Sequence, residues 1–190
     1  MNLDLHHSIV TLHMVSSLDG FIAKKDGDVS WMRSTDTYAA GVELTDEIIK
    51  KFLDKIDCYV MGSHTYEDAV KLGWPYGDVP VYVITNRTLK SERKSVQFYS
   101  GDLIPFVNNK LRNRYKNIWM VGGSGLTREF LRYNLGDEII VSIMPIILGD
   151  GILFFDFVGR ELLLHLKDVT AYKDGMVELT YDILRNKVAE

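Results

Sequence analysis

The stretch Ile118–Leu131, with the sequence IWMVGGSGLTREFL, decides how the rest of the chain is interpreted. An apolar run ends at Val121, three glycines fall within the next four positions, and a helical pattern follows directly. Glycine removes the Cβ where a strand gives way to a helix, so either a tight turn forms there or a ligand approaches the backbone. A helix N-terminus carries unpaired N–H groups that favour an anion such as phosphate. The stretch lacks the G-x-G-x-x-G spacing, so taken alone it leaves both interpretations open.

Composition limits the class of protein. The 190 residues are 46% hydrophobic and 25% charged, which predicts one globular domain spanning residues 1–190. A formal charge of −4 argues against nucleic acid as a partner, so any contact with an anion must be local. No apolar run approaches the ~18 residues that cross a bilayer, and the N-terminus lacks a basic start and a cleavage site. We therefore expect a cytoplasmic protein without a membrane partner.

Short apolar runs alternate with helical patterns along most of the chain. The runs are rich in Val, Ile, Tyr and Phe, as buried strands should be. The predicted strands are Ile9–Ser16, Cys58–Met61, Val81–Thr85, Val96–Tyr99, Ile118–Val121, Glu138–Met144, Leu163–Tyr172 and Met176–Leu184. The predicted helices are about Thr45–Lys55, Thr65–Lys71, Leu103–Tyr115 and Leu126–Tyr133.

Strands separated by helices require crossover connections, which predict an α/β fold with a mostly parallel sheet covered on both faces. The last two strands are joined by Lys173–Asp174–Gly175, a hairpin turn that makes them antiparallel. An eight-stranded mixed sheet with about four helices results.

Three of the predicted strand ends carry groups suited to an anion. Ligands of such sheets bind beyond the carboxyl ends of the parallel strands. The three segments are Gly62–Ser63–His64–Thr65, Thr85–Asn86–Arg87 and Gly122–Gly123–Ser124–Gly125. Each alone is explained as well by a turn, a cap or an exposed loop, but the three together favour a cofactor rich in phosphate.

The chain resembles the dihydrofolate reductase-like superfamily, and within it the reductase domain of the bifunctional riboflavin-biosynthesis deaminase–reductase. Four motifs, spread over nearly the whole chain, carry the resemblance. They are Ser17–Ala23 (SLDGFIA), Met61–Glu67 (MGSHTYE), Val121–Leu126 (VGGSGL) and Pro145–Gly151 (PIILGDG). The resemblance implies a three-layer αβα domain of stand-alone type that takes NADPH as hydride donor.

The resemblance also implies which residues bind the cofactor. Val15, Ile22 and Ala23 would touch the nicotinamide, and Thr85, Asn86 and Arg87 would approach the 2′-phosphate. The phosphate and adenosine side would be bound by Gly62, Ser63, His64 and Thr65, and the diphosphate by Gly122, Gly123, Ser124, Gly125 and Leu126. The glycines of the opening stretch would then allow the backbone to meet the diphosphate.

The chain departs from the family pattern in three places. Ser63 stands where many relatives have Arg or Lys, so preference for NADPH over NADH would rest on Arg87, with Lys90 or Arg93 as further candidates. An NADH-preferring reductase stays an alternative. Met120–Val121 replaces the glutamate that usually precedes the double glycine. The chain also lacks the cysteines of the deaminase zinc signature. The substrate is therefore expected to be a small heterocycle, either a pyrimidine such as 5-amino-6-(5-phosphoribosylamino)uracil or a dihydropterin.

The catalytic candidates are Trp31, Asp36 and Glu47. Trp31 resembles the family tryptophan beside the nicotinamide, although an aromatic that covers the core explains it equally well. Asp36 has the spacing of the acid that follows that tryptophan in bacterial dihydrofolate reductases, whereas counting backward from Gly62 points to Asp46 or Glu47. An acid in the first turn of a helix is more often a capping residue. Asp19 is expected to shape its Asp–Gly turn.

Other side chains are expected to be structural. The single cysteine, Cys58, excludes an internal disulfide and is interpreted as a buried, inert thiol. The histidines are too dispersed for a metal site, and only His64 is a candidate donor to phosphate. Apolar segments such as Ile143–Ile147 and Ile152–Phe157 suggest a homodimer. A nucleotide-binding or sensor module without turnover is the alternative to an enzyme.

Overall fold

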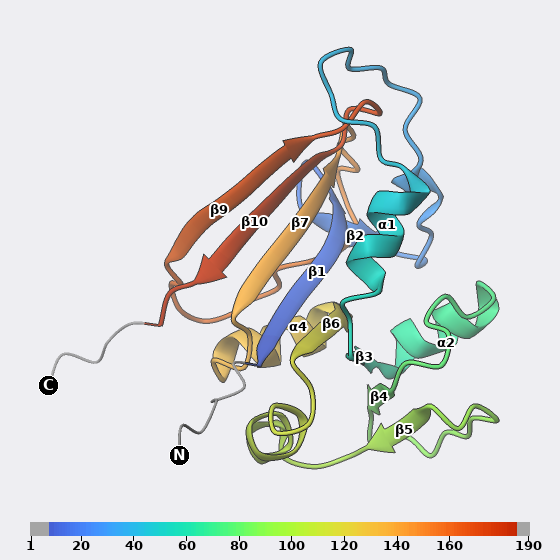
Figure 1. The fold of residues 1–190 in the computed structure, drawn as a ribbon, viewed down its shortest axis with the longest axis vertical. Helices are drawn as coiled ribbons and strands as arrows, with labels where there is room; N and C mark the ends of the chain where they lie inside the picture. The colour runs from blue at the N-terminus through green and yellow to red at the C-terminus, as the bar shows by residue number, and fades with distance from the viewer. Residues whose placement is uncertain (1–7, 186–190) are drawn as a thin grey trace, which may run out of the picture.

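The computed structural model describes residues 8–185, and its centre is an eight-stranded sheet in the order β5-β4-β3-β6-β1-β7-β10-β9 (Figure 1). The strands are β1 (Ile9–Ser17), β3 (Cys58–Gly62), β4 (Val81–Ile84), β5 (Val96–Tyr99), β6 (Asn117–Gly122), β7 (Glu138–Met144), β9 (Leu164–Ala171) and β10 (Val177–Ile183). All eight predicted strands are confirmed, with ends that differ by one residue at most.

The sheet is parallel from β5 to β7 and antiparallel from β7 to β9. The change of direction comes from the predicted hairpin. Tyr172 donates its N–H to the carbonyl of Met176 over 2.8 Å, and Gly175 occupies the turn with φ +81°. Only residues with little steric hindrance adopt this φ readily, so the glycine permits the tight reversal.

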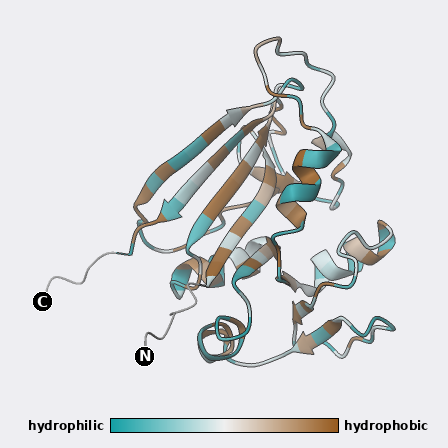
Figure 2. Ribbon diagram, in the orientation of Figure 1, coloured by the Kyte–Doolittle hydropathy of each residue, from teal (hydrophilic) through white to brown (hydrophobic). Residues whose placement is uncertain are grey.

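Helices cover the two faces of the sheet, as the sequence predicts. One face packs against α4 (Ser124–Arg132) and the π-type helix η2 (Phe106–Leu111), which bury Phe130, Leu131 and Val107 against Leu12 and Met120. The opposite face packs against α2 (Ser63–Lys71) and against Phe52 of α1 (Asp46–Leu53). Figure 2 shows both hydrophobic and hydrophilic residues on α1 and a largely hydrophobic β7, which fits an amphipathic helix on a buried strand.

The helix starts follow local chemistry. Thr45 is the N-cap of α1, and its hydroxyl accepts a hydrogen bond from the N–H of Ile48 over 3.3 Å, as the predicted start at this residue requires. Helices α2 and α4 begin two residues earlier than predicted, at Ser63 and Ser124, because in each case the preceding glycine is the N-cap.

The helix predicted over Leu103–Tyr115 is confirmed from Leu103 to Leu111, and it ends four residues before the predicted end. A single turn, α3 (Leu103–Pro105), is followed by η2, whose wider winding is seen where Arg112 donates its N–H to the carbonyl of Val107 over 3.0 Å. The helix then ends at Leu111. Directly after this end, the guanidinium of Arg112 donates a hydrogen bond to the carboxylate of Asp137 over 2.7 Å. This tertiary contact competes with continuation of the helix.

A second, two-stranded sheet was not predicted. It pairs β2 (Phe21–Ala23) with β8 (Ile152–Leu153) and so brings together the loops that follow β1 and β7. The carboxylate of Asp19 fastens the same two loops, because it accepts hydrogen bonds from the N–H groups of Leu148 and Gly149 over 3.1 and 2.7 Å. Asp19 therefore joins two loops in addition to lying in its own turn, where Gly20 donates to the carbonyl of Ser17 over 2.9 Å.

Candidate functional site

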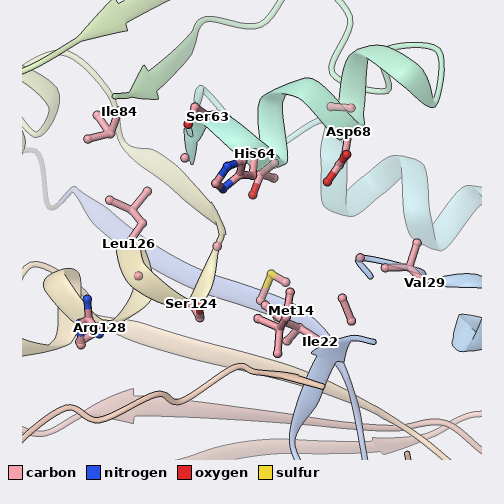
Figure 3. Close-up of a pocket in the computed structure, with 18 of the residues that line it drawn as sticks. Met14, Ile22, Val29, Ser63, His64, Asp68, Ile84, Ser124, Leu126 and Arg128 are labelled. Carbon is pink, nitrogen blue, oxygen red and sulfur yellow. The ribbon is translucent and has the colours of Figure 1, made fainter. Parts of the chain in front are cut away.

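A cavity of about 740 Å³ lies at the carboxyl ends of the parallel strands, where the starts of α2 and α4 face each other (Figure 3). Its volume is in the range of cofactor and small-molecule sites. Figure 3 shows Ser63 and His64 from α2 opposite Ser124 and Leu126 from α4, with Met14 of β1 and Ile22 of β2 at another part of the wall.

The starts of α2 and α4 make this wall of the cavity a site for negative charge. The N-caps, Gly62 and Gly123, offer no side chain to the first-turn N–H groups, and neither first turn contains an acidic residue. Each helix therefore presents unpaired N–H donors and the positive end of its dipole to the cavity. Two such ends meeting at one cavity suit a ligand with more than one phosphate.

The double glycine of the opening stretch is required by its backbone conformation. Gly122 and Gly123 have φ +121° and +88°, values that residues with a Cβ rarely adopt. At Gly122 a Cβ would also lie 2.6 Å from the sulfur of Met14. Gly123 lines the cavity, so its missing side chain leaves the backbone open to a ligand. The turn and the open backbone, which the sequence left as alternatives, occur together.

The structure brings most of the predicted cofactor residues to this cavity. Those that line it are Ile22, Ala23, Gly62, Ser63, His64, Thr65, Gly123, Ser124, Gly125 and Leu126. Those that do not line it are Val15, Thr85, Asn86, Arg87 and Gly122. Gly122 lies against the side chain of Met14, and Val15 packs in a separate cluster that contains Trp31.

Arg87 lies beside the cavity in an ion pair. Its guanidinium donates to both carboxylate oxygens of Glu67 over 2.6 and 2.9 Å, and it reaches the hydroxyl of Ser63 at 3.4 Å. The Arg87 hydrogen bonds hold the pKa of Glu67 below its usual value, so the pair persists through neutral pH. Ser63 connects this cation to the cavity wall.

Sequence reasoning missed several lining residues, among them Met14, Met32 and Arg128. Arg128 lies one helical turn after Ser124, so the spacing of the predicted helix could have placed it on the same face. The guanidinium of Arg128 pairs with Asp156 over 2.9 Å, which ties α4 to the loop after β8. Met32 directly follows Trp31 and carried no signal of its own.

Two of the three catalytic candidates, Trp31 and Asp36, lie at one cavity, and Glu47 lies apart from them. Trp31 is buried and lines a second cavity of about 520 Å³ together with Asp36. The indole Nε1 of Trp31 has no hydrogen-bond partner within residues 8–185. Glu47 lies on the exposed side of α1 in an ion pair of 2.8 Å with Lys51, and neither it nor Asp46 lines either cavity.

Two further properties concern the whole described chain. Among residues 8–185, no three or more His, Cys, Asp or Glu side chains gather so as to hold a metal ion, and no helix has the length and apolarity to span a membrane. Cys58 is fully buried, as predicted, and burial raises the pKa of its thiol, which disfavours the reactive thiolate.

Comparison with known proteins agrees with this architecture. The model of the RibD C-terminal domain family matches residues 8–178. The uncharacterized protein YwjB of Bacillus subtilis (strain 168) is 30% identical over 172 residues, which is 90% of this chain and 95% of that protein.

Two solved structures share the fold. One, a protein of Shewanella sp. PV-4 assigned to riboflavin biosynthesis, superposes with a TM-score of 0.78 at 23% identity, over 93% of this chain and 99% of the other. A diaminohydroxyphosphoribosylaminopyrimidine deaminase/5-amino-6-(5-phosphoribosylamino)uracil reductase of Thermotoga maritima superposes with a TM-score of 0.67 at 16% identity, over 94% of this chain and 57% of the other. Since the family model matches nearly all of the described residues, the chain belongs to the RibD C-terminal domain family.

Proposed function

We propose that the protein is an NADPH-dependent reductase that transfers hydride to a small heterocyclic substrate. The observation that carries the proposal is the meeting of two uncapped helix N-termini, at Gly62 and Gly123, on one cavity. A dinucleotide carries its diphosphate near its middle, and such a pair of positive ends suits this group.

The walls of the cavity differ in polarity in the way that a dinucleotide needs. Hydroxyl groups of Ser63, Thr65 and Ser124 stand at the helix starts, whereas Met14 and Ile22 form an apolar wall at the ends of β1 and β2. An apolar wall suits a nicotinamide ring and excludes water from it. The bound cofactor would supply the hydride, and this chain would bind and orient it.

Gly123 tests whether the site fits a diphosphate. It lines the cavity with φ +88°, and the nearest atom to a Cβ built there is the hydroxyl of Thr65 at 3.5 Å. A side chain at position 123 would therefore lie next to Thr65, which also lines the cavity, and would take up space between the starts of α2 and α4. The absence of a side chain supports a ligand that contacts the backbone.

The substrate class rests on the family. The Thermotoga protein is named for reduction of a ribosylaminopyrimidine, and its fold is shared over nearly the whole of this chain. We infer a pyrimidine of that kind or a dihydropterin as the substrate here. Trp31 and Asp36, which meet at the second cavity, stay candidates for the substrate side, and Glu47 is the weaker candidate because it is exposed and paired with Lys51.

We also infer a homodimer. The apolar segments expected to exceed what one chain can bury do leave large side chains exposed, including Ile147, Phe155 and Phe157 at 69%, 45% and 78%. The edge strand β9 adds Leu166 and Val169, exposed at 48% and 52%. Exposed apolar side chains on neighbouring segments are typical of a protein interface.

Titration with NADPH tests the proposed function directly. Wild-type protein should change NADPH fluorescence on binding, and Gly123→Val should abolish this change. Gly73→Val is the matched control, because Gly73 has a similar φ of +94°, open space around it and no place in the cavity wall. Both glycines have a positive φ, so each variant strains the backbone, and only the first blocks the site.

Turnover separates an enzyme from a passive binding module. Oxidation of NADPH should be observed with at least one substrate among dihydropterins and the ribosylaminopyrimidine of riboflavin biosynthesis. Equal NADPH binding by wild type and Gly123→Val would remove the site proposed here.

A further inference from the structure

The central strands β1 and β6 separate before they end. They pair from Ile9 to Leu12, with Leu12 opposite Met120, and beyond this point β1 pairs only with β7 while β6 pairs only with β3. The sheet therefore forks at its carboxyl edge. Met14 lines the cofactor cavity on one side of the fork, and the next residue, Val15, faces the opposite side of the sheet because side chains alternate along a strand.

On that opposite side a polar row begins next to Val15. Val15 lies directly opposite Ser142 of β7, and Ser142 lies directly opposite Glu178 of β10. Since neighbouring strands are ~4.8 Å apart, Glu178 lies about 10 Å from Val15, a distance that one or two fused heterocyclic rings can span. A ring that receives hydride at the fork would thus extend toward Glu178.

The polar row is held in one arrangement by hydrogen bonds. The hydroxyl of Ser142 donates to Oε2 of Glu178 over 2.9 Å, and because a hydroxyl has one hydrogen, Ser142 accepts from Nε2 of His13 at 3.2 Å. His13 is itself fixed between aromatic rings, stacked on Trp119 at 5.0 Å and in edge contact with Phe52 at 5.2 Å. Burial lowers the pKa of His13 to about 4, so its imidazole is neutral at pH 7.

Glu178 has no cationic partner among the described residues. Its nearest basic group is the neutral His13, whose Nε2 is 3.7 Å from Oε2, whereas its strand neighbour Asp182 pairs with Lys167 over 3.1 Å. The side chain of Glu178 is only 26% exposed. A carboxylate that is largely withdrawn from water and lacks a counter-ion is costly unless a donor completes its hydrogen bonds.

Aromatic and apolar side chains lie near both ends of this polar row. Trp31, Tyr172 and Met176 form a cluster against which Val15 packs, and the hydroxyl of Tyr172 lies 3.5 Å from Oε1 of Glu178. Phe52 of α1 lies on the His13 side of the row. Flat apolar surfaces next to a carboxylate suit an aromatic ring with polar edges.

We propose that Glu178, positioned by Ser142, binds the substrate through a ring N–H that lies beside an amino group. A carboxylate only accepts hydrogen bonds, so it matches two adjacent donors and is repelled by a carbonyl next to a single N–H. The substrate is then an amino-substituted heterocycle. This inference rests on the proposed function for the hydride but assigns the substrate-binding carboxylate to β10, away from Asp36, Asp46 and Glu47.

Two matched ligands and two matched variants test the assignment. The ligands are 6-aminouracil, which has a ring N–H beside its amino group, and uracil, which lacks the amino group. Binding is measured by quenching of tryptophan fluorescence, with and without NADPH, in wild type, Glu178→Gln and Asp182→Asn. Asp182 is the control because it lies on the same strand and the same face, four residues further along.

Wild type and Asp182→Asn should bind 6-aminouracil at least about tenfold more tightly than uracil, which corresponds to one charge-assisted hydrogen bond. Glu178→Gln should lose this preference and keep its affinity for NADPH. Ser142→Ala should weaken 6-aminouracil binding to a smaller extent, because it loosens the carboxylate without removing it. Thermal unfolding of each variant shows that the fold is retained.

Equal binding of 6-aminouracil by wild type and Glu178→Gln overturns the inference, as does a wild type that binds neither ligand or does not distinguish them. Failure of the proposed function looks different. If NADPH does not bind but the preference for 6-aminouracil depends on Glu178, the hydride donor is wrong and the substrate site stands. If NADPH binds and Glu178→Gln changes nothing, the reductase stands and this site is wrong.

Discussion

The carboxylate of Asp19 accepts a hydrogen bond of 2.7 Å from the backbone N–H of Gly149, 130 positions further along the chain. Asp19 also accepts a hydrogen bond from the hydroxyl of Ser17, and these contacts lower its pKa, with the Ser17 bond as the main cause. The bond to Gly149 connects the first and the last motif of the sequence. Through β2 and β8 it fixes Ile22 and Ile152, which line the cavity between the starts of α2 and α4.

Asp19→Asn should therefore weaken NADPH binding, by about tenfold, because a charge-assisted hydrogen bond becomes a neutral one and the two loops loosen. The measurement is a fluorescence titration, with Asp26→Asn, an exposed acid of the following loop, as control. The contribution of Asp19 should be present above its usual pKa and be lost as pH falls through its lowered pKa. Unchanged affinity in Asp19→Asn would separate the loop contact from the cofactor site.

Arg87 and Glu67 should set the preference between the two pyridine nucleotides. Arg87→Ala should weaken NADPH binding by roughly tenfold and leave NADH binding nearly unchanged, because only NADPH carries a 2′-phosphate. Glu67→Gln should have the opposite effect on the ratio, since the carboxylate that now occupies the guanidinium is neutralised. Dissociation constants for both nucleotides give the result.

Arg93→Ala serves as the control for Arg87, because Arg93 follows in the same loop but lies over the ring of Trp74 at 4.9 Å. It should leave the ratio of the two dissociation constants unchanged. Equal constants for NADPH and NADH in wild type would remove the role proposed for Arg87.

Burial of His13 should make the protein less stable in acid. The pKa of His13 is about 4 in the folded protein, against an ordinary value of 6.5. Between these two pH values, His13 binds a proton in the unfolded chain but not in the folded one. The free energy of unfolding should then fall by about 2 kcal/mol from His13 alone between pH 7 and pH 5, and the loss should level off below the folded pKa.

Urea unfolding at several pH values measures this dependence. His13→Gln should flatten the curve between pH 6.5 and pH 4, whereas His165→Gln, on the exposed strand β9, should leave it unchanged. An identical pH dependence in wild type and His13→Gln would show that burial does not shift the pKa of His13.

The exposed apolar edge should make the protein a dimer. Light scattering at micromolar concentration is expected to give twice the mass of one chain, and Leu166→Lys should shift it to the monomer. Leu166 is half exposed and lies opposite Tyr181 in the register of β9 and β10. His165→Lys, next to it on the other face, is the control, and a monomeric wild type would contradict the interface.

The sequence predicted the elements of the fold well because their signals are local. Runs of Val and Ile mark strands such as Val81–Ile84, and a Thr followed by two acids marks the start of α1. The end of the helix that starts at Leu103 was placed four residues too far, because the contact beside its true end, between Arg112 and Asp137, joins residues far apart in the chain. The short strands β2 and β8 were missed because each is stable only against the other.

The residues that line the cavity between α2 and α4 were also largely predictable, and the polar row that ends at Glu178 was not. Glycines and hydroxyls that follow strands signal helix starts at the carboxyl edge, and this signal predicts that Ser63 and Ser124 lie there. An acid in a strand gives no such signal. Glu178 lies within the predicted strand Met176–Leu184, and only the pairing of β10 with β7 brings it to Ser142.

The sequence by itself determined the order of strands and helices, the terminal hairpin and the bare backbone of Gly122 and Gly123, because periodicity and glycine conformation depend on neighbouring residues. The tertiary structure alone decided that β1 and β6 separate, that Arg87 is held by Glu67, and that His13 and Glu178 share one hydroxyl. These features arise from register and side-chain packing between distant strands, whose energies no single stretch of sequence contains.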